Sequence, residues 1–178
     1  MHTPWGAAIA FDGPHSRQVR DFFIRYQDRL LYGTDGHEAK CFHVLDGLGF
    51  TLLRHAGIQR ALVTARISEV VERRGRELQV PHIHTHERSK LACMQRIAAG
   101  MGIGMDQVAF VGDDLPDLAT MRNVGLAIAP ANAHHWVLPV AHWVTPRRGG
   151  EGAGRDACDL LLHAQDHVEG ILAHGEHP

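Results

Sequence analysis

This sequence contains few cysteines and no long apolar runs. Its positive and negative charges nearly balance. The three cysteines, Cys41, Cys93 and Cys158, are odd in number and far apart, which is typical of reduced cytosolic thiols and not of a disulfide framework. No apolar run approaches the roughly 18 residues of a membrane helix, and the first 13 residues lack the features of a secretory signal. We therefore expect a cytoplasmic protein that does not span a membrane.

The charge balance limits the classes of partner. The net charge is −2 with neutral histidines, so no basic face is indicated for nucleic acid or a membrane surface. Apolar residues make up 44% of the chain and charged residues 21%, which is ordinary for a globular protein. A chain of 178 residues can bury a hydrophobic core, so we expect one domain over residues 1–178.

Histidine is abundant by contrast, with 15 copies that include HIHTH at 82–86 and HH at 134–135. Such clusters suggest metal ligation, but no cysteine pair and no His-Glu-x-x-His motif accompanies them. Imidazole ligands need fixed geometry and supporting hydrogen bonds. We therefore interpret these residues as surface or loop histidines.

Short apolar runs alternate along the chain with segments in which apolar residues recur at helical spacing. The apolar runs predict strands at 6–13, 61–65, 108–112, 126–130 and 142–146. The helical spacing predicts helices at 45–57, 66–78, 90–101, 115–125 and about 155–173. Strands that alternate with helices indicate an α/β fold with a parallel sheet covered on both faces. Such folds bind ligands beyond the carboxyl ends of their strands.

The segment VGDDLPDLATM at 111–121 carries the strongest functional signal. Asp113, Asp114 and Asp117 follow an apolar strand within five positions, so they concentrate negative charge at a strand end. Carboxylate oxygens suit a hard divalent cation such as Mg²⁺. The alternative is a helix cap by Asp113 or Asp114, but a cap needs one aspartate and not three.

Two further positions fit a phosphate ligand. Thr64 ends a strand and Arg66 lies on the turn that follows, where a hydroxyl and backbone amides can hold a phosphate oxygen. Lys90 begins a helix and could neutralise phosphate charge. Read alone, Thr64 could be a helix cap and Lys90 a solvated lysine. They support a phosphate site only together with the aspartates.

Four segments together are similar to a known family. They are GHEAKCFHVLDGLGFTLLRHAGI (36–58), ALVTARIS (61–68), GDDLPDLATMRNVGLAIAPANAH (112–134) and RRGGEGAGRDACDLLL (147–162). Their order and spacing, over about residues 28–172, resemble the 3-deoxy-manno-octulosonate 8-phosphate phosphatases. These belong to the haloacid dehalogenase superfamily, in the branch without a large cap domain. The resemblance implies a Rossmann-like three-layer domain, a β-hairpin flap, Mg²⁺, a homotetramer and a role in lipopolysaccharide biosynthesis.

The resemblance also implies roles for individual residues. In the family a first aspartate attacks phosphorus, and a second, two residues on, protonates the leaving sugar oxygen and then activates water. The matching residues in this chain would be Thr64 and Lys90 for the phosphoryl oxygens, Arg66 for the sugar acid, and Asp113 for Mg²⁺, supported by Asp114 and Asp117. The loop 149–155 would lie near the site. The flap would occupy about residues 19–44 and turn near Asp35–Gly36, a strong turn dipeptide.

The first catalytic motif of the family, Asp-x-Asp, is absent from this chain. Counting back without gaps makes Asp21 the nucleophile and puts Phe23 at the acid position, after a strand formed by SRQVR. A strand over 6–13 instead makes Asp12 either the nucleophile, with Pro14 replacing the acid, or the acid, with Ala10 replacing the nucleophile. A central parallel strand is buried on both faces, so the apolar run that ends at Asp12 is favoured.

Every alignment loses one of the two carboxylates, so Asp12 and Asp21 compete as the nucleophile, and Asp12 would also be a metal ligand. Two hypotheses follow. The chain is a weakened Mg²⁺-dependent phosphatase for a small acidic sugar phosphate, or it is an inactive member with a binding, assembly or regulatory role.

Overall fold

A parallel sheet forms the centre of the protein. The computed structural model describes residues 21–24, 29–32 and 38–174. Six strands pair side by side in the order β5-β4-β1-β6-β7-β8, and every neighbouring pair is parallel. The strands are β1 (Asp21–Ile24), β4 (Arg60–Val63), β5 (His82–His84), β6 (Val108–Val111), β7 (Leu126–Ala129) and β8 (Trp143–Val144).

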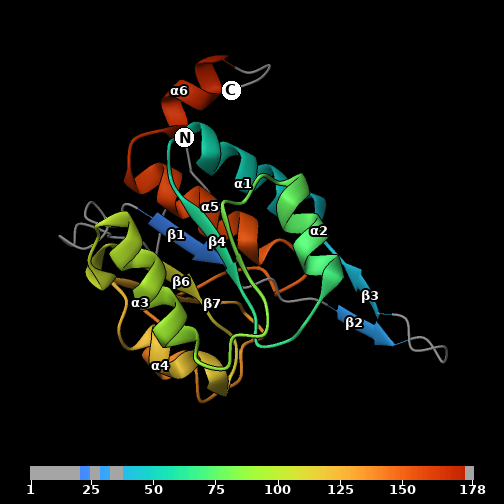
Figure 1. Cartoon of the computed structure of the whole chain (residues 1–178). Helices are drawn as coiled ribbons and strands as arrows, with labels where there is room; N and C mark the ends of the chain where they lie inside the picture. The colour runs from blue at the N-terminus through green and yellow to red at the C-terminus, as the bar shows by residue number, and fades with distance from the viewer. Residues whose placement is uncertain (1–20, 25–28, 33–37, 175–178) are drawn as a thin grey trace.

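Helices cover both faces of this sheet, with α1 and α5 on one face and α3 and α4 on the other (Figure 1). The helices are α1 (Val44–His55), α2 (Glu69–Glu77), α3 (Lys90–Met101), α4 (Leu118–Met121), α5 (Ala153–Ala164) and α6 (Val168–His174), with 3-10 turns η1 (Met105–Gln107), η2 (Leu115–Asp117) and η3 (Leu138–Val140). Within the described ranges no helix has the length and apolar character needed to cross a bilayer. The predicted three-layer α/β fold is confirmed.

The alternation of strand side chains explains why the strand sequences are almost wholly apolar. Leu62 and Val111 face one core, which also contains Phe50 of α1 and Leu161 of α5. Their neighbours in sequence face a second core on the α3 side, where Phe110 packs with other buried residues. Both faces of the sheet are buried, so a polar residue in the middle of these strands would be desolvated.

The position of β1 corrects the predicted first strand. β1 pairs with β4 on one side and β6 on the other, with Phe22 opposite Arg60 and opposite Ala109. The central place in the sheet is therefore filled by Asp21–Ile24 and not by a strand over 6–13, which lies outside the described residues. The alternative strand SRQVR also lies outside the described residues, and Asp21, which that alternative places after the strand, lies within β1. The prediction favoured a long apolar run because a central strand is buried on both faces. The actual strand begins at Asp21 and is only four residues long, so that criterion did not find it.

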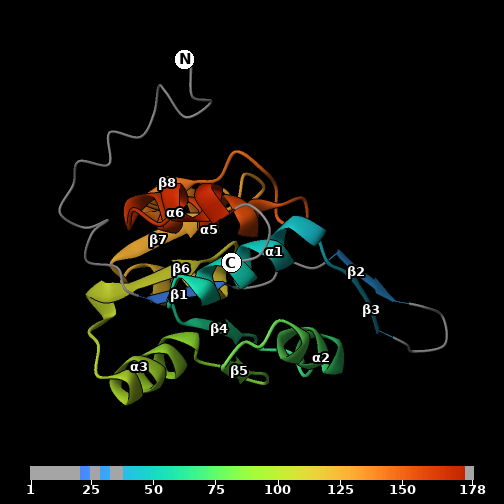
Figure 2. The same ribbon diagram turned by 90° about the horizontal axis from the view of Figure 1, so that it is seen from above.

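A separate hairpin projects from the body of the protein beyond α1 and α2 (Figures 1 and 2). Its strands β2 (Arg29–Tyr32) and β3 (Glu38–Cys41) pair antiparallel, which confirms the predicted hairpin. The predicted turn at Asp35–Gly36 lies outside the described residues. The predicted start at residue 19 is wrong, because Asp21–Ile24 belongs to the main sheet.

Two other elements differ from the prediction. The predicted C-terminal helix at 155–173 is two helices, α5 and α6, interrupted near Asp166, where the backbone has a φ of 59°. The HIHTH segment contains β5, a three-residue strand at the edge of the sheet, which the sequence did not predict. Its histidines, His82 and His84, are half-buried on this edge strand, so they lie partly at the surface, as one of the two predicted alternatives had it, and not in a loop.

Candidate functional site

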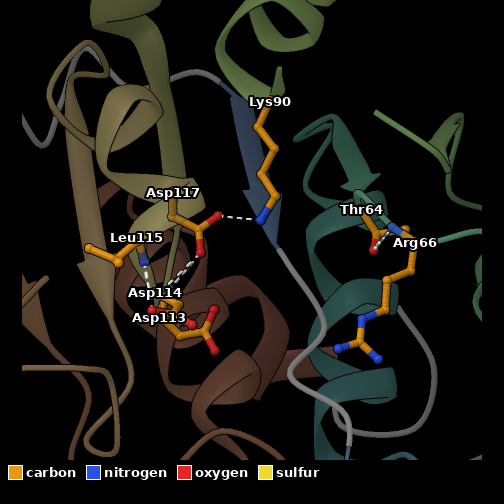
Figure 3. Close-up of polar contacts among 7 residues, drawn as sticks. All are labelled: Thr64, Arg66, Lys90, Asp113, Asp114, Leu115 and Asp117. Atoms are coloured by element: carbon orange, nitrogen blue, oxygen red, sulfur yellow. Dashed lines mark hydrogen bonds and ion pairs between the residues drawn. The ribbon is translucent and has the colours of Figure 1, made fainter. Parts of the chain in front are cut away.

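The predicted phosphate and metal residues gather where the strand order of the sheet reverses. From β1 the chain builds β4 and β5 on one side of the sheet and β6, β7 and β8 on the other. Thr64 directly follows β4, and Asp113 follows β6, so they flank the carboxyl end of β1 (Figure 3). A crevice at such a reversal is the usual ligand site of open parallel sheets.

The three aspartates of the 111–121 segment have different roles. Asp117 is fully buried, and its Oδ2 accepts hydrogen bonds from the backbone N–H of Asp113 (3.1 Å) and Asp114 (3.2 Å). Oδ1 of Asp114 accepts one from the Leu115 N–H at 2.7 Å, so the helix-cap alternative holds for Asp114. These contacts shape the loop and leave Asp113 as the carboxylate best suited to a metal ion.

Lys90 enters the site from the start of α3. The Oγ of Ser89 caps this helix by accepting from the Ala92 N–H at 3.3 Å, and Gly102, with a φ of 70°, ends it. Nζ of Lys90 donates to Oδ1 of Asp117 at 2.5 Å, and both side chains are almost completely buried. The ammonium is therefore fixed beside the aspartate loop, where it can also donate a hydrogen bond to a phosphate oxygen.

Thr64 and Arg66 form the opposite side of the site, across the end of β1 (Figure 3). Oγ1 of Thr64 accepts from the Arg66 N–H at 3.2 Å. The Thr64 backbone is also tied to the segment after β5: its N–H donates to the His84 carbonyl (2.9 Å), and its carbonyl accepts from the Glu87 N–H (3.0 Å). The turn is thus rigid, while the hydroxyl retains a proton to donate to a ligand.

His134 and Asn132, to which the sequence assigned no role in this site, connect Asp113 to the loop 149–155. The N–H of His134 donates to the Asp113 carbonyl at 2.8 Å. Oδ1 of Asn132 accepts from the Gly149 N–H at 2.7 Å. Both residues follow β7 at the same sheet edge as Asp113, and that position was the signal available in the sequence.

Two buried carboxylates hold the start of α5. Oδ1 of Asp46 accepts from the Arg155 N–H at 2.8 Å, and Oδ2 of Asp156 accepts from the Arg147 N–H at 3.1 Å. Burial raises the pKa of both carboxyls, although these hydrogen bonds and nearby arginines act in the opposite direction. The loop between Arg147 and Arg155 is therefore anchored at both ends by groups that the sequence reasoning missed.

The strand register separates Asp21 from this site. Asp21 lies opposite Val108 at the amino end of β6, whereas Asp113 comes two residues after its last residue, Val111. Five residues of extended chain span about 16 Å. Carboxylates that share one Mg²⁺ lie much closer, because each is bonded to the ion at about 2.1 Å. Asp12, the other candidate, lies outside the described residues.

The described residues fit a magnesium ion in part. Mg²⁺ is usually held by one or two carboxylates together with waters and substrate phosphates. Asp113 offers such a carboxylate at the sheet edge, beside groups suited to phosphate. Asp117 does not fit, because its two oxygens are engaged by Lys90 and by backbone N–H groups.

Comparison with known proteins agrees with this fold. Residues 55–153 match the family of haloacid dehalogenase-like hydrolases. A 3-deoxy-D-manno-octulosonate 8-phosphate phosphatase from Yersinia pestis is 42% identical over 144 residues, which cover 80% of this chain and 77% of that protein. The enzyme of the same name from Escherichia coli K12 is 39% identical over 143 residues, covering 80% and 76%.

Solved structures give the same result over more of the chain. A hypothetical protein from Xanthomonas campestris is 40% identical, with a TM-score of 0.92 over 99% of both chains. The phosphatase from Moraxella catarrhalis, solved with magnesium, phosphate and KDO, is 32% identical, with a TM-score of 0.87 over 91% of this chain and 96% of that one. This chain therefore belongs to the haloacid dehalogenase-like hydrolases and, within them, to the family of 3-deoxy-manno-octulosonate 8-phosphate phosphatases.

Proposed function

We propose that this protein binds a small acidic sugar phosphate of the 3-deoxy-manno-octulosonate 8-phosphate type together with Mg²⁺, and that it acts as a phosphatase with weakened turnover. The observation that carries the proposal is the convergence of Thr64, Lys90 and Asp113 around the end of β1, from three separate segments. Hydroxyl, ammonium and carboxylate groups are what a phosphate bound with Mg²⁺ requires.

The phosphate would be held from two sides. The Thr64 hydroxyl would donate to one phosphoryl oxygen, and the Lys90 ammonium would neutralise the charge of another. Arg66 is exposed at the mouth of the site, where its guanidinium can pair with the carboxylate of a sugar acid in a bidentate manner. Bound Mg²⁺ would be held by Asp113 and would stabilise charge on the phosphoryl group.

The chemical step is where this chain departs from its relatives. Asp-x-Asp is absent, and the residues that follow β1 in the sequence are Arg25, Tyr26, Gln27 and Asp28. The register of β1 argues against Asp21 as the nucleophile. Loss of the general acid alone removes a factor of about 10²–10⁴ in rate. We therefore expect turnover well below that of a family member with an intact motif.

The same register favours a second candidate function. A member that keeps the groups for phosphate and metal but lacks a catalytic nucleophile would bind ligand without releasing phosphate. Such a protein could assemble with itself or an active relative and regulate it, and the resemblance favours a homotetramer. Binding without turnover is the property that separates this candidate from the first.

One experiment separates the two. Purified protein with Mg²⁺ is mixed with 3-deoxy-D-manno-octulosonate 8-phosphate, and released phosphate and binding heat are measured in parallel. Phosphate release that is lost in Asp113→Asn supports the phosphatase, and binding without release supports the non-catalytic member. Absence of both contradicts the proposal. Asp166→Asn is the matched control, because Asp166 is exposed between α5 and α6 and Asn tolerates its positive φ.

A further inference from the structure

A second cluster of metal-ligating side chains lies outside the site described above. One nitrogen of His84, one carboxylate oxygen of Glu87 and the Sγ of Cys93 all lie within 4.8 Å of one another. They come from β5, from the segment that follows it and from α3. The HIHTH segment suggested metal ligation, but the sequence did not connect His84 with Cys93, which is nine residues further on and has no second cysteine nearby.

We propose that His84, Glu87 and Cys93 form a binding site for one borderline-soft divalent cation of the zinc class. Zn²⁺ combines thiolate, imidazole and carboxylate ligands, and three protein ligands leave a fourth position for water. Bonds of about 2.0–2.3 Å in a tetrahedron set the ligand atoms about 3.3–3.8 Å apart. The three side chains therefore have to approach one another by about 1.5 Å at most.

The surroundings of the cluster suit such an ion. Cys93 is completely buried, so its sulfur is shielded, while the side chain of His84 is 35% exposed and gives access from solvent. Glu87 Oε1 lies 4.0 Å from His84 Nδ1 and 2.6 Å from an Arg96 nitrogen. The Arg96 ion pair holds the carboxylate in place, and its second oxygen can face the ion.

Metal binding at this cluster must displace a proton. Burial, together with the neighbouring Glu87, raises the pKa of the Cys93 thiol to about 11, so the sulfur carries a proton when no ion is bound. On binding, the S–H bond breaks, the proton passes to solvent and the thiolate electron pair binds the cation. Affinity should therefore increase as the pH rises.

The cluster is connected to the candidate active site through the backbone of Thr64. The carbonyl of His84 accepts from the Thr64 N–H, and the N–H of Glu87 donates to the Thr64 carbonyl. An ion that joins His84 to Glu87 would therefore brace the turn that carries the Thr64 hydroxyl. This consequence rests on the proposed function, whereas the metal site itself does not.

The test uses Co²⁺ as a spectroscopic substitute for Zn²⁺ on the full-length, chelator-treated protein. One equivalent of Co²⁺ should produce a thiolate-to-cobalt charge-transfer band in the near ultraviolet, and one equivalent of Zn²⁺ should remove it. Asp113 and its neighbours contain no thiol, so binding at the magnesium site gives no such band. A wild-type protein without the band overturns the proposal.

Variants assign the band to the cluster. Cys93→Ala should abolish it, and His84→Gln should weaken Co²⁺ affinity at least about tenfold, since even outer partners of metal ligands have effects of this size. Cys41→Ser is the matched control, because Cys41 is an exposed thiol on β3, and it should keep the band. A band that survives Cys93→Ala, or one that is lost in Cys41→Ser, contradicts the assignment. Because His84 lies partly at the surface, His84→Gln tests the site without creating a cavity in the hydrophobic core.

Discussion

Nζ of Lys90 donates to Oδ1 of Asp117 at 2.5 Å, and the two side chains are 2% and 0% exposed. The residues are 27 positions apart, so this contact joins the start of α3 to the loop that carries Asp113. Asp117 also accepts from the backbone of that loop. The phosphate and metal sides of the candidate site are therefore fixed relative to each other by a single buried carboxylate.

Replacing Lys90 by methionine should destabilise the protein strongly. Lys90→Met keeps the length of the side chain but leaves the buried Asp117 carboxylate without its cation, which typically costs about 3–5 kcal/mol. Urea denaturation measures the change in the free energy of unfolding. Arg73→Met is the control, because the Arg73–Glu77 pair is 82% and 49% exposed and should contribute less than about 1 kcal/mol. Equal losses of stability in the two variants would show that burial does not increase the contribution of the Lys90–Asp117 pair to the free energy of unfolding.

Gly112 should not tolerate a side chain. A Cβ at this position would lie 2.6 Å from Cβ of Asp117 and 2.7 Å from Sδ of Met121. Gly112→Ala should therefore cost about 1–3 kcal/mol through overpacking and should weaken Mg²⁺ binding by displacing the loop. Gly100→Ala is the opposite case, because nothing lies within 4 Å of its Cβ and alanine favours the helix by up to about 1 kcal/mol. Thermal unfolding of both variants should show shifts of opposite sign, and shifts of the same sign would contradict the prediction.

The free energy of unfolding should depend on pH because the Asp46 carboxyl is buried. Its pKa is raised above the ordinary 3.8, mainly by burial. The folded state therefore binds the proton more tightly than the unfolded state does. The resulting stabilisation is complete below about pH 3.8 and is lost as the pH rises through the folded-state pKa.

Asp46→Asn removes this titration and keeps an oxygen to accept from the Arg155 N–H. The free energy of unfolding of the variant minus that of the wild type should therefore increase from pH 4 towards neutrality, a range set by the upward shift from about 3.8. Urea titrations at several pH values measure this difference. A difference that stays constant, or decreases with pH, would show that burial does not raise this pKa.

Asp21 and Asp113 should differ sharply in their effect on metal binding. Asp21 lies opposite Val108 at the amino end of the sheet, whereas Asp113 follows the carboxyl end of β6. Asp113→Asn should reduce Mg²⁺ affinity at least about tenfold, whereas Asp21→Asn should leave it within about twofold, because only the former removes the proposed direct ligand. Titration calorimetry with Mg²⁺ and inorganic phosphate measures both. A large effect of Asp21→Asn would reinstate Asp21 as a site residue.

Periodicity predicted most of the elements that surround the site. The apolar runs at 61–65, 108–112 and 126–130 became β4, β6 and β7 because both faces of a covered parallel sheet exclude polar residues. The same rule misplaced the first strand, because it favoured the longest apolar run near the N-terminus. Pairing with β4 and β6, and not length, decided that Asp21–Ile24 takes the central position. The edge strand β5 was not predicted because it is three residues long and contains two histidines.

The sequence by itself determined the α/β class, the parallel sheet and the order of Thr64, Lys90 and Asp113 along the chain. These follow from local patterns of apolar and polar residues, which repeat at the spacing of strands and helices. Only the tertiary structure decided the roles of Asp117 and Asp46. Each of these depends on a contact with a residue distant in sequence, and burial changes what a carboxylate can do. The absent Asp-x-Asp was visible in the sequence, but the distance of Asp21 from the site followed only from strand register.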